Sequence, residues 1–402
     1  MRTKIYFDHS ATTPVDPEVL KAMMPYLKDK FGNASSAHSF GQEAMKGVDS
    51  AREAIANFLG CEPKELIFTS GATESDNIVI QGVIKATKEK FPERKLHIIT
   101  SAIEHPAILE PCREMEKAGV LVTYLPVTEK GLVRVGDVEK AITDDTVSIS
   151  IMYVNNEVGT IQPIAEIGGI VKAVKDGRQK AGNKLPLIFH TDAVQAVNYC
   201  NCQVNELGID LMSISGHKIY GPKGIGALYV RGGTLIKSIQ LGGHQERGIR
   251  AGTLNTIGII GLGKAVELVN RKQSSSAELR RIKELRDKLV EGVLKTIPES
   301  QVNGDLEKRV PSNTHFSFLN AEGESILLML DLEGIAVSTG SACASGSLAP
   351  SHVLLAMGVP KEVAHGSLRV TLGRFTKEKD IYKFLKILPP IIKKLREMSP
   401  IK

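Results

Sequence analysis

The chain has 402 residues, which is more than one hydrophobic core usually holds, so we expect two domains. Apolar residues make up 42% of the chain and charged residues 24%, proportions that are ordinary for a soluble globular protein. The formal net charge is +6, but the basic residues form no long runs. We therefore expect solvated helix faces and no nucleic-acid-binding surface.

The sequence indicates neither membrane insertion nor secretion. No apolar stretch is long enough to cross a bilayer, and the first residues lack the apolar core and cleavage site of a signal peptide. The cysteines are odd in number and widely scattered, namely Cys61, Cys112, Cys200, Cys202 and Cys343. Such a set is not a disulfide framework and fits a reducing compartment. We therefore expect a cytoplasmic protein that contacts no membrane.

Helical and strand patterns alternate between residues 43 and 230. We expect helices over 43–59, 73–90, 107–118 and 165–180, separated by strands over 65–68, 96–100, 147–154, 185–190 and 210–214. Two of these strands are almost continuously apolar, as in strands that are buried on both faces. The alternation predicts an α/β fold in which a mainly parallel central sheet carries helices on both faces.

The pattern changes after Leu262, where long charged segments begin. We expect, in order, a charged helix over 271–294, a strand over 315–319, a helix over 324–333, a strand over 367–372 and a terminal helix over 377–398. This order predicts a second, smaller α+β domain. We place the large domain at 16–262 and the small domain at 1–15 and 263–402.

Lys218 follows the predicted strand 210–214 and stands among glycines, a histidine and a proline in the segment 215–224. This is an unusual place for a solvated surface charge. It suits a lysine that forms a Schiff base, because that chemistry requires an amine that loses its proton readily. An ordinary polar loop lysine fits the pattern equally well.

Asp192 follows the apolar strand 185–190, at the strand end where α/β sheets bind ligands. A pyridoxal ring requires such a carboxylate, which keeps its pyridine nitrogen protonated. Taken alone, a helix N-cap explains Asp192 better. Because Lys218 comes about one strand and one turn later, the cofactor role gains support.

The segment 69–77 joins a predicted strand to a predicted helix. Its glycine in the turn, followed by Ala72 and Thr73 at the helix start, can cradle a phosphate, because the first backbone N–H groups of a helix are unpaired. The segment lacks the lysine of a P-loop and the glycine spacing of a dinucleotide fingerprint. An ordinary Ser/Thr cap is the alternative.

His105 and Asn155 also follow predicted strands. His105 could stack on a planar cofactor or move protons, or it could simply cap the helix that begins at the following proline. The strand ends near residues 70, 105, 155 and 192 bring polar groups to one edge of the sheet. This convergence predicts a ligand site at that edge.

Cys343 lies in the segment 338–350, which glycine, serine and alanine dominate. We expect this segment to be exposed and mobile, so that its thiol is reactive; a tolerated surface thiol is the alternative. Arg369 interrupts an apolar strand and suits a grip on a substrate carboxylate, or else faces solvent at a sheet edge. Cys200 and Cys202 have no second pair nearby, so we expect no metal site.

Together these segments resemble the cysteine desulfurases of the fold-type I pyridoxal-phosphate superfamily, which are class-V aminotransferase-like. The likeness is strongest to the group that serves iron–sulfur assembly and nitrogenase maturation. It covers nearly the whole chain, from residue 8 to residue 376. The motifs that carry it are 71–75 (GATES), 155–159 (NNEVG), 215–224 (SGHKIYGPKG), 245–248 (QERG), 250–253 (RAGT) and 340–343 (GSAC).

The resemblance implies that the large domain binds pyridoxal 5'-phosphate. Lys218 would bond covalently to the cofactor, Asp192 would face its pyridine nitrogen, Gln195 would lie near its phenolic oxygen, and His105 would stack on its ring and assist catalysis. Asn155 would contact the cofactor. The residues expected to hold the phosphate are Ala72, Thr73, Ser215, His217 and, from the partner subunit of a homodimer, Thr253.

The resemblance also implies a reaction. Asn155 and Arg369 would bind the carboxylate of L-cysteine, and Lys218 would remove its Cα proton. Cys343, on a loop of the small domain, would take the sulfur as a persulfide while L-alanine leaves. The sulfur would then pass to an iron–sulfur scaffold protein or another acceptor, and Cys343 could share a cluster with that scaffold as a ligand.

Two other functions remain open at this point. One is a selenocysteine lyase or another pyridoxal-phosphate enzyme acting on small amino acids, which Cys343 on its loop disfavours. The other is a non-catalytic scaffold for iron–sulfur clusters, which would have no use for Lys218, Asp192 and the phosphate turn. The residues leave two points open. These are the identity of the physiological sulfur acceptor and whether the pathway is general or specific to nitrogenase.

Overall fold

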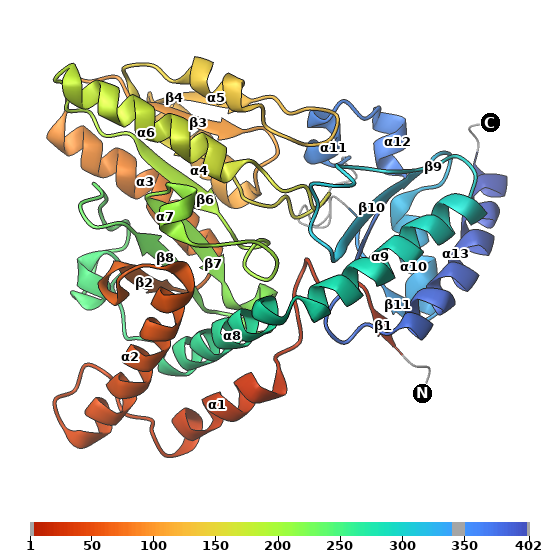
Figure 1. Cartoon of the computed structure of the whole chain (residues 1–402), viewed down its shortest axis with the longest axis horizontal. Coiled ribbons are helices and arrows are strands. Elements are labelled where there is room, and N and C mark those ends of the chain that lie inside the picture. The colour runs from red at the N-terminus through yellow and green to blue at the C-terminus, as the bar shows by residue number, and fades with distance from the viewer. Residues whose placement is uncertain (1–3, 340–349, 400–402) are drawn as a thin grey trace.

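The computed structural model describes residues 4–339 and 350–399. Within them a seven-stranded sheet has the strand order β2-β8-β7-β6-β5-β3-β4 (Figure 1). Its strands are β2 (Leu66–Thr69), β3 (His97–Ser101), β4 (Leu121–Leu125), β5 (Thr146–Ser150), β6 (Ile188–Asp192), β7 (Leu211–Ser215) and β8 (Gly226–Val230). All pairs from β7 through β4 are parallel, whereas β8 is antiparallel to β7 and to β2. The mainly parallel sheet is therefore confirmed.

Helices cover both faces of this sheet. They are α1 (Pro17–Lys28), α2 (Ser39–Leu59), α3 (Ala72–Lys90), α4 (Pro106–Lys117), α5 (Val135–Ala141), α6 (Ile164–Lys180), α7 (Val204–Leu207) and α8 (Thr256–Ser275), with short 3₁₀ turns η1 (Pro63–Glu65), η2 (Gly216–Lys218) and η3 (Gln245–Gly248). None of the helices within the described residues is long and apolar enough to span a bilayer.

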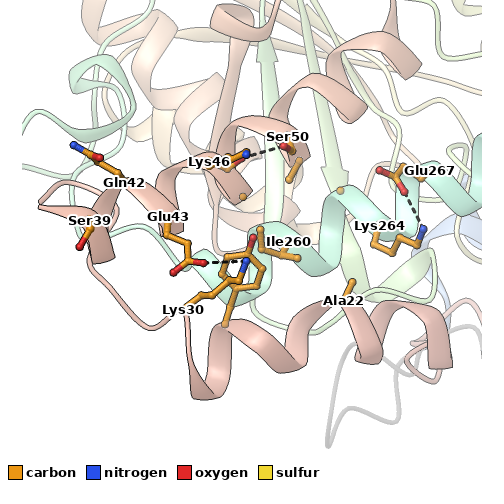
Figure 2. Close-up of a pocket in the computed structure, with 14 residues that line it drawn as sticks. Ala22, Lys30, Ser39, Gln42, Glu43, Lys46, Ser50, Ile260, Lys264 and Glu267 are labelled. Carbon is orange, nitrogen blue, oxygen red and sulfur yellow. Dashed lines mark hydrogen bonds and ion pairs between the residues drawn. The ribbon is translucent and has the colours of Figure 1, made fainter. Parts of the chain in front are cut away.

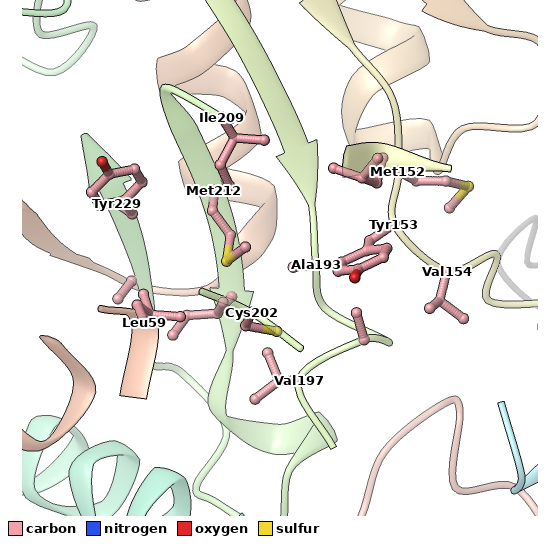
Figure 3. Close-up of a cluster of buried hydrophobic side chains, with 14 of the residues drawn as sticks. Leu59, Met152, Tyr153, Val154, Ala193, Val197, Cys202, Ile209, Met212 and Tyr229 are labelled. Carbon is pink, nitrogen blue, oxygen red and sulfur yellow. The ribbon is translucent and has the colours of Figure 1, made fainter. Parts of the chain in front are cut away.

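Both faces of the central strands are apolar, which explains their continuous hydrophobic sequence. Successive side chains of a strand point to opposite faces. On β6, Ile188 packs with residues of α3 and α4, whereas Phe189 packs with residues of α2, α6 and α8. Figure 3 shows part of the apolar cluster that contains Phe189. In this cluster Met212 of β7 lies near Tyr229, its strand partner on β8.

The small domain lies at the opposite end of the molecule in Figure 1, with both chain termini beside it. Its strands are β1 (Ile5–Tyr6), β9 (Ser300–Val302), β10 (Asn313–Phe318), β11 (Ile335–Ala336) and β12 (Ser367–Thr371), and its helices are α9 (Ala277–Thr296), α10 (Gly323–Leu332) and α13 (Glu378–Met398). The helices α11 (His352–Ala356) and α12 (Lys361–His365) lie in the same part of the sequence, but their buried residues, such as Leu354 and Ala364, belong to the core of the large domain. β10 pairs antiparallel with β9 and β12, and β1 pairs parallel with β11. A separate apolar core joins β1, α9, β10 and α13.

The charged helix expected over 271–294 is in fact parts of two helices. Ser276 has a left-handed backbone (φ 49°) that ends α8 and starts α9. Residues of α8 as far as Val269 pack in the core of the large domain, whereas Ile282 of α9 packs in the small-domain core. The expected boundary after Leu262 therefore falls inside α8, and we propose Ser276 as the boundary.

Candidate active site

A cavity of about 620 Å³ lies at the carboxyl ends of the parallel strands. Strand ends from β5, β6 and β7, the start of α3, and the N-terminal segment around Ser10 contribute to its lining. Of the residues expected in the site, the cavity brings together Ala72, Thr73, His105, Asp192, Gln195, Ser215, His217, Lys218 and Arg369. The convergence of strand ends that the sequence indicated is thus present in the structure.

Lys218 ends the 3₁₀ turn η2, which directly follows β7. Its Nζ atom donates to the backbone carbonyl of Ala11 at 2.8 Å and to that of Ser10. Gln195 Nε2 donates to the same Ser10 carbonyl at 2.9 Å. The N-terminal segment therefore holds the amine of Lys218 at the cavity, and Lys218 is not an ordinary solvated loop residue.

Asp192 is the last residue of β6 and is buried. Its Oδ1 accepts a hydrogen bond from the backbone N–H of Val194 at 2.9 Å, which fixes the carboxyl in the turn after the strand. Burial raises the pKa of Asp192 to about 6, against the opposing effects of the Val194 N–H and of the Lys218 ammonium. A further cation in the cavity would favour the charged form of Asp192.

The turn before α3 forms an anion cradle. A β-carbon added at Gly71 would lie 3.9 Å from Ser215 Oγ, so this hydroxyl stands beside the open N-terminus of the helix. The one acidic residue in the first turn, Glu74, is paired with Arg250 at 2.8 Å. Burial lowers the pKa of His217 to about 4, helped by Lys218, so its ring is neutral at pH 7. These groups suit a phosphate.

His105 both caps α4 and lines the cavity. Its Nδ1 accepts from the Ala107 N–H at 3.1 Å. Burial lowers the pKa of His105 to about 4, and the Lys218 charge lowers it further. The two interpretations of His105 are therefore compatible, because the ring is neutral, fixed through one nitrogen and exposed to the cavity.

Asn155 is buried, and its amide is used within the chain. Oδ1 accepts from the N–H groups of Glu157 and Val158 at 2.9 Å each, and Nδ2 donates to the Ile103 carbonyl at 3.0 Å. Among the described residues, the neighbouring Asn156 lines the cavity instead. The contact of Asn155 with cofactor and substrate stays a prediction, and the geometry favours Asn156 for it.

Arg369 of β12 is buried and reaches the cavity from the small domain. Nη2 contacts Asp8 Oδ1 at 3.0 Å, and Nη1 donates to the Asn156 carbonyl at 3.0 Å. In the described part of the chain its Nε–H has no hydrogen-bond partner. The arginine is therefore not a solvent-facing edge residue, and it lines the cavity.

Besides Asn155, one more expected residue within the described chain does not line the cavity. Thr253 is exposed and does not line the cavity formed by the described residues of its own chain. Cys343 lies outside the described residues. The described chain on either side of it borders the site: the backbones of Ser338 and Arg369 exchange two hydrogen bonds, and His352 Nε2 contacts the Glu104 carbonyl at 3.0 Å.

The remaining cysteines are poorly suited to nucleophilic chemistry. Burial raises the pKa of Cys61, Cys112 and Cys200 to about 12, and it raises that of Cys202 as well. None of these four described thiols lines the cavity. Because the thiolate is the reactive form, these four described thiols are poor nucleophiles, and the reactivity of Cys343 stays a prediction.

Residues 10–12, Asp76 and Asn156 also line the cavity but were not expected there from the sequence. Asp76 comes three residues after Thr73 on α3, so helical spacing alone would have placed it on the same side as the phosphate turn. Asn156 adjoins Asn155, and the exact end of a strand decides which of two neighbours faces a ligand. Residues 10–12 carry no local signal.

A hollow of about 680 Å³ between α1, α2 and α8 is similar in size but different in character (Figure 2). Four of its charged side chains form two ion pairs, Lys30 with Glu43 at 3.1 Å and Lys264 with Glu267 at 3.0 Å. It lies among helices, away from the strand ends. We therefore assign the active site to the strand-end cavity.

Comparison with known proteins agrees with this assignment. The aminotransferase class-V family matches residues 5–384. The chain is 51% identical over 402 residues to the cysteine desulfurase IscS of Dictyoglomus turgidum, covering 100% of this chain and 98% of that protein. A solved NifS-like protein superposes with a TM-score of 0.87 at 38% identity, over 97% of this chain and 100% of the other.

A further solved structure is that of SspA in complex with cysteine. It superposes with a TM-score of 0.78 at 36% identity, over 93% of this chain and 100% of the other. The matches extend over both domains and over every segment that lines the strand-end cavity. The chain therefore belongs to the aminotransferase class-V family and, within it, to the cysteine desulfurases.

Proposed function

We propose that this chain removes the sulfur atom of L-cysteine, releases L-alanine and holds the sulfur as a persulfide on Cys343. The observation that carries the proposal is the single cavity in which Lys218, Asp192 and His105 meet a phosphate-binding turn. The cysteine desulfurase of D. turgidum and the SspA structure with cysteine support the choice of substrate.

The cavity residues fit pyridoxal 5'-phosphate. Lys218 would hold the aldehyde carbon of the cofactor, Asp192 its ring nitrogen, and the neutral His105 one face of its ring. When bound, the cofactor supplies an electron sink for the charge left at the substrate's Cα. The residues of this chain that would hold the phosphate are Ala72, Thr73, Ser215 and His217.

Lys218 would have a second task when the substrate is bound. Its amine would take the proton from Cα of the substrate, which requires Nζ to lie within reach of that proton. The N-terminal carbonyls of Ser10 and Ala11 keep Nζ at the cavity, so the amine remains there. Arg369, which lines the cavity, would orient the substrate through its carboxylate.

Sulfur transfer takes place between two sulfur atoms. The Cys343 thiolate attacks the substrate sulfur, an S–S bond forms, and the bond between that sulfur and Cβ breaks. The electron pair of the broken bond stays with the carbon fragment, which gains a proton and becomes alanine. L-cysteine and a protein thiol thus give L-alanine and a protein persulfide, so this step requires no outside oxidant. Release of the sulfur as sulfide requires a reducing thiol.

The surroundings of the enzyme belong to the same proposal. The resemblance to the iron–sulfur assembly group supports a scaffold protein as the sulfur acceptor, and the scattered cysteines support a cytoplasmic location. The exposed position of Thr253, away from its own cavity, supports a homodimer in which it reaches the phosphate site of the second copy.

Replacement of Cys343 tests the proposal. We expect Cys343→Ala to bind the cofactor with the visible absorption of the unaltered protein, because Cys343 holds no part of it. Sulfide formation from L-cysteine in the presence of a reducing thiol should fall by about 1,000-fold or more, as when another enzyme loses its nucleophile. The control is Cys61→Ala, which removes a half-buried thiol outside the cavity and should keep its activity.

The two possible failures have different meanings. Undiminished sulfide formation by Cys343→Ala would show that another group accepts the sulfur. If the unaltered protein shows no visible absorption from bound cofactor, the assignment of the cavity is instead contradicted.

A further inference from the structure

Asp76 is a second carboxyl group at the cavity, and the mechanism above does not use it. It lies in the first turns of α3, and its side chain is completely shielded from solvent. α3 packs against β5, β6 and β7, and Asp76 Oδ1 lies 3.7 Å from His190 Nε2. His190 and Asp192 are alternate residues of β6 and so point to the same face of the sheet. Asp76 therefore faces the strand that carries Asp192.

The two carboxyl groups differ in their partners. Asp192 accepts a hydrogen bond from the Val194 N–H, and the Lys218 ammonium favours its charged form. Neither oxygen of Asp76 has a hydrogen-bond partner within the described residues. The Ser213 hydroxyl favours the charged form of Asp76, and the same hydroxyl stands 3.1 Å from His190 Nε2 and is bonded there.

No cation of the described chain neutralises Asp76. Burial lowers the pKa of His190 to about 3, so its ring, held between Ser150 at 2.9 Å and Ser213, is uncharged at pH 7. The other group that acts on Asp76 is Glu104, a buried acid whose pKa is raised to about 8 by burial. Asp76 is thus surrounded by neutral or acidic groups.

We propose that Asp76 is held as a neutral carboxylic acid and so keeps the negative charge of the Asp76–Asp192 pair on Asp192, opposite the ring nitrogen of the cofactor. Two carboxyl groups that are both shielded from solvent at one site do not both ionise, so the pair shares one proton. The group with the weaker partners takes that proton, and this group is Asp76.

The electrostatics of the site agree with this arrangement. Burial raises the pKa of Asp76 well above its usual range, and the neighbouring Asp192 raises it further. Asp76 is a positioning residue, because it acts on the cofactor through Asp192. The inference rests on the proposed role of Asp192 at the ring nitrogen, but the protonation of Asp76 itself can be measured without the cofactor.

Infrared difference spectra of the whole chain test the protonation directly. A protonated carboxyl group has a carbonyl stretch that is separate from the stretches of a carboxylate and shifts in D₂O. We expect this band at pH 7 in the unaltered protein, both with and without pyridoxal phosphate, and we expect its loss in Asp76→Asn. If the spectrum of the unaltered protein minus that of Asp76→Asn contains carboxylate bands instead, Asp76 is ionised and the inference is wrong.

Glu104→Gln provides the matched control, because Glu104 is also a buried acid beside Asp192. It accepts hydrogen bonds from Ser101 and from the Met152 N–H, so its band should differ in position from that of Asp76. The two variants therefore assign the two bands separately. Folding of each variant is checked by circular dichroism.

The cofactor-loaded protein gives a second readout through the pH titration of its visible absorption. If Asp76 is neutral, Asp76→Asn replaces one uncharged group with another. The midpoint of the absorption titration should then move by well under one pH unit. If Asp76 is ionised, Asn removes a negative charge and should lower the midpoint by about one unit or more. A lowered midpoint would overturn the inference; failure of the cofactor to bind the unaltered protein would instead contradict the proposed function.

Discussion

The two walls of the cavity belong to different domains, and the residues expected to hold cofactor and substrate are paired differently on each. On the large-domain wall, Asp192 and His105 are each fixed by a hydrogen bond from the backbone two residues further on. On the small-domain wall, Arg369 spans to Asp8 and Asn156 but leaves Nε without a partner in the described chain. We therefore expect Asp192 and His105 to hold the cofactor in positions that the protein alone fixes, and Arg369 to bind the substrate carboxylate. Binding of cofactor and binding of substrate should therefore be separable by mutation.

The largest expected effect is that of Lys218→Ala on the large-domain wall. Without the amine, the cofactor has no covalent bond to the protein and no group takes the Cα proton, so both steps fail. We expect the visible absorption of the bound cofactor to change and alanine formation to fall by about 10²–10⁴-fold or more, since general base catalysis alone contributes that much.

Lys264→Ala is a control for this variant, because Lys264 belongs to the separate hollow of Figure 2 and pairs with Glu267 there. Lys264→Ala should keep both the visible absorption of the bound cofactor and the rate of alanine formation. Full alanine formation by Lys218→Ala would contradict the assignment of the large-domain wall.

An intermediate effect is expected from Arg369→Gln on the small-domain wall. The variant loses a charged hydrogen bond to the substrate carboxylate, which is worth about 1.5–3 kcal/mol, so KM for L-cysteine should rise by about 10–100-fold. Cofactor affinity should change little, because the cofactor contacts come from the large domain. Arg369→Lys keeps the charge but not the forked geometry. Its KM should therefore lie between those of the unaltered protein and Arg369→Gln. An equal loss of cofactor affinity would show that the walls do not act separately.

The fold and most of the large-domain wall could be predicted from the sequence because both follow from strand ends. Buried parallel strands give apolar runs, and each run ends in a polar residue, so the pattern predicts Asp192 and His105 at the sheet edge but leaves a helix cap open for each. Lys218 also follows a strand, but a lone lysine there has an ordinary explanation. Only the structure brings Ser10 and Ala11 to its amine and so places it at the cavity.

The small-domain wall and the inter-element contacts could not be predicted in the same way. The break between α8 and α9 occurs at Ser276, where neither glycine nor proline marks the turn. β8 is as apolar as the parallel strands of the sheet, so its sequence does not show its direction. Only its pairing with β7 and β2 shows that it runs antiparallel. The contacts of Arg369 join residues that are far apart in the chain, so no local pattern encodes them.

The smallest expected effect concerns the pH dependence of stability on the large-domain wall. Burial lowers the pKa of His105 from 6.5 to about 4, so the unfolded chain binds more protons than the folded one between these values. The free energy of unfolding should therefore fall as the pH drops through this window. His105→Asn keeps a cap for α4 but removes the titration, and it should reduce that fall by on the order of 1 kcal/mol between about pH 7 and pH 5.

Chemical denaturation of the cofactor-free protein at several pH values measures this slope. An unchanged slope in His105→Asn would mean that His105 is not the buried neutral ring described above.

The most direct test of the central claim is to locate the sulfur after a single turnover. The unaltered, cofactor-loaded protein is mixed with one equivalent of L-cysteine without a reducing thiol, alkylated, digested and examined by mass spectrometry, while the alanine formed is measured in parallel. We predict that the peptide carrying Cys343 gains one sulfur atom for each alanine released. Alanine formation with the extra sulfur on Cys61, Cys112, Cys200 or Cys202, or with no sulfur bound to the protein, would contradict the account.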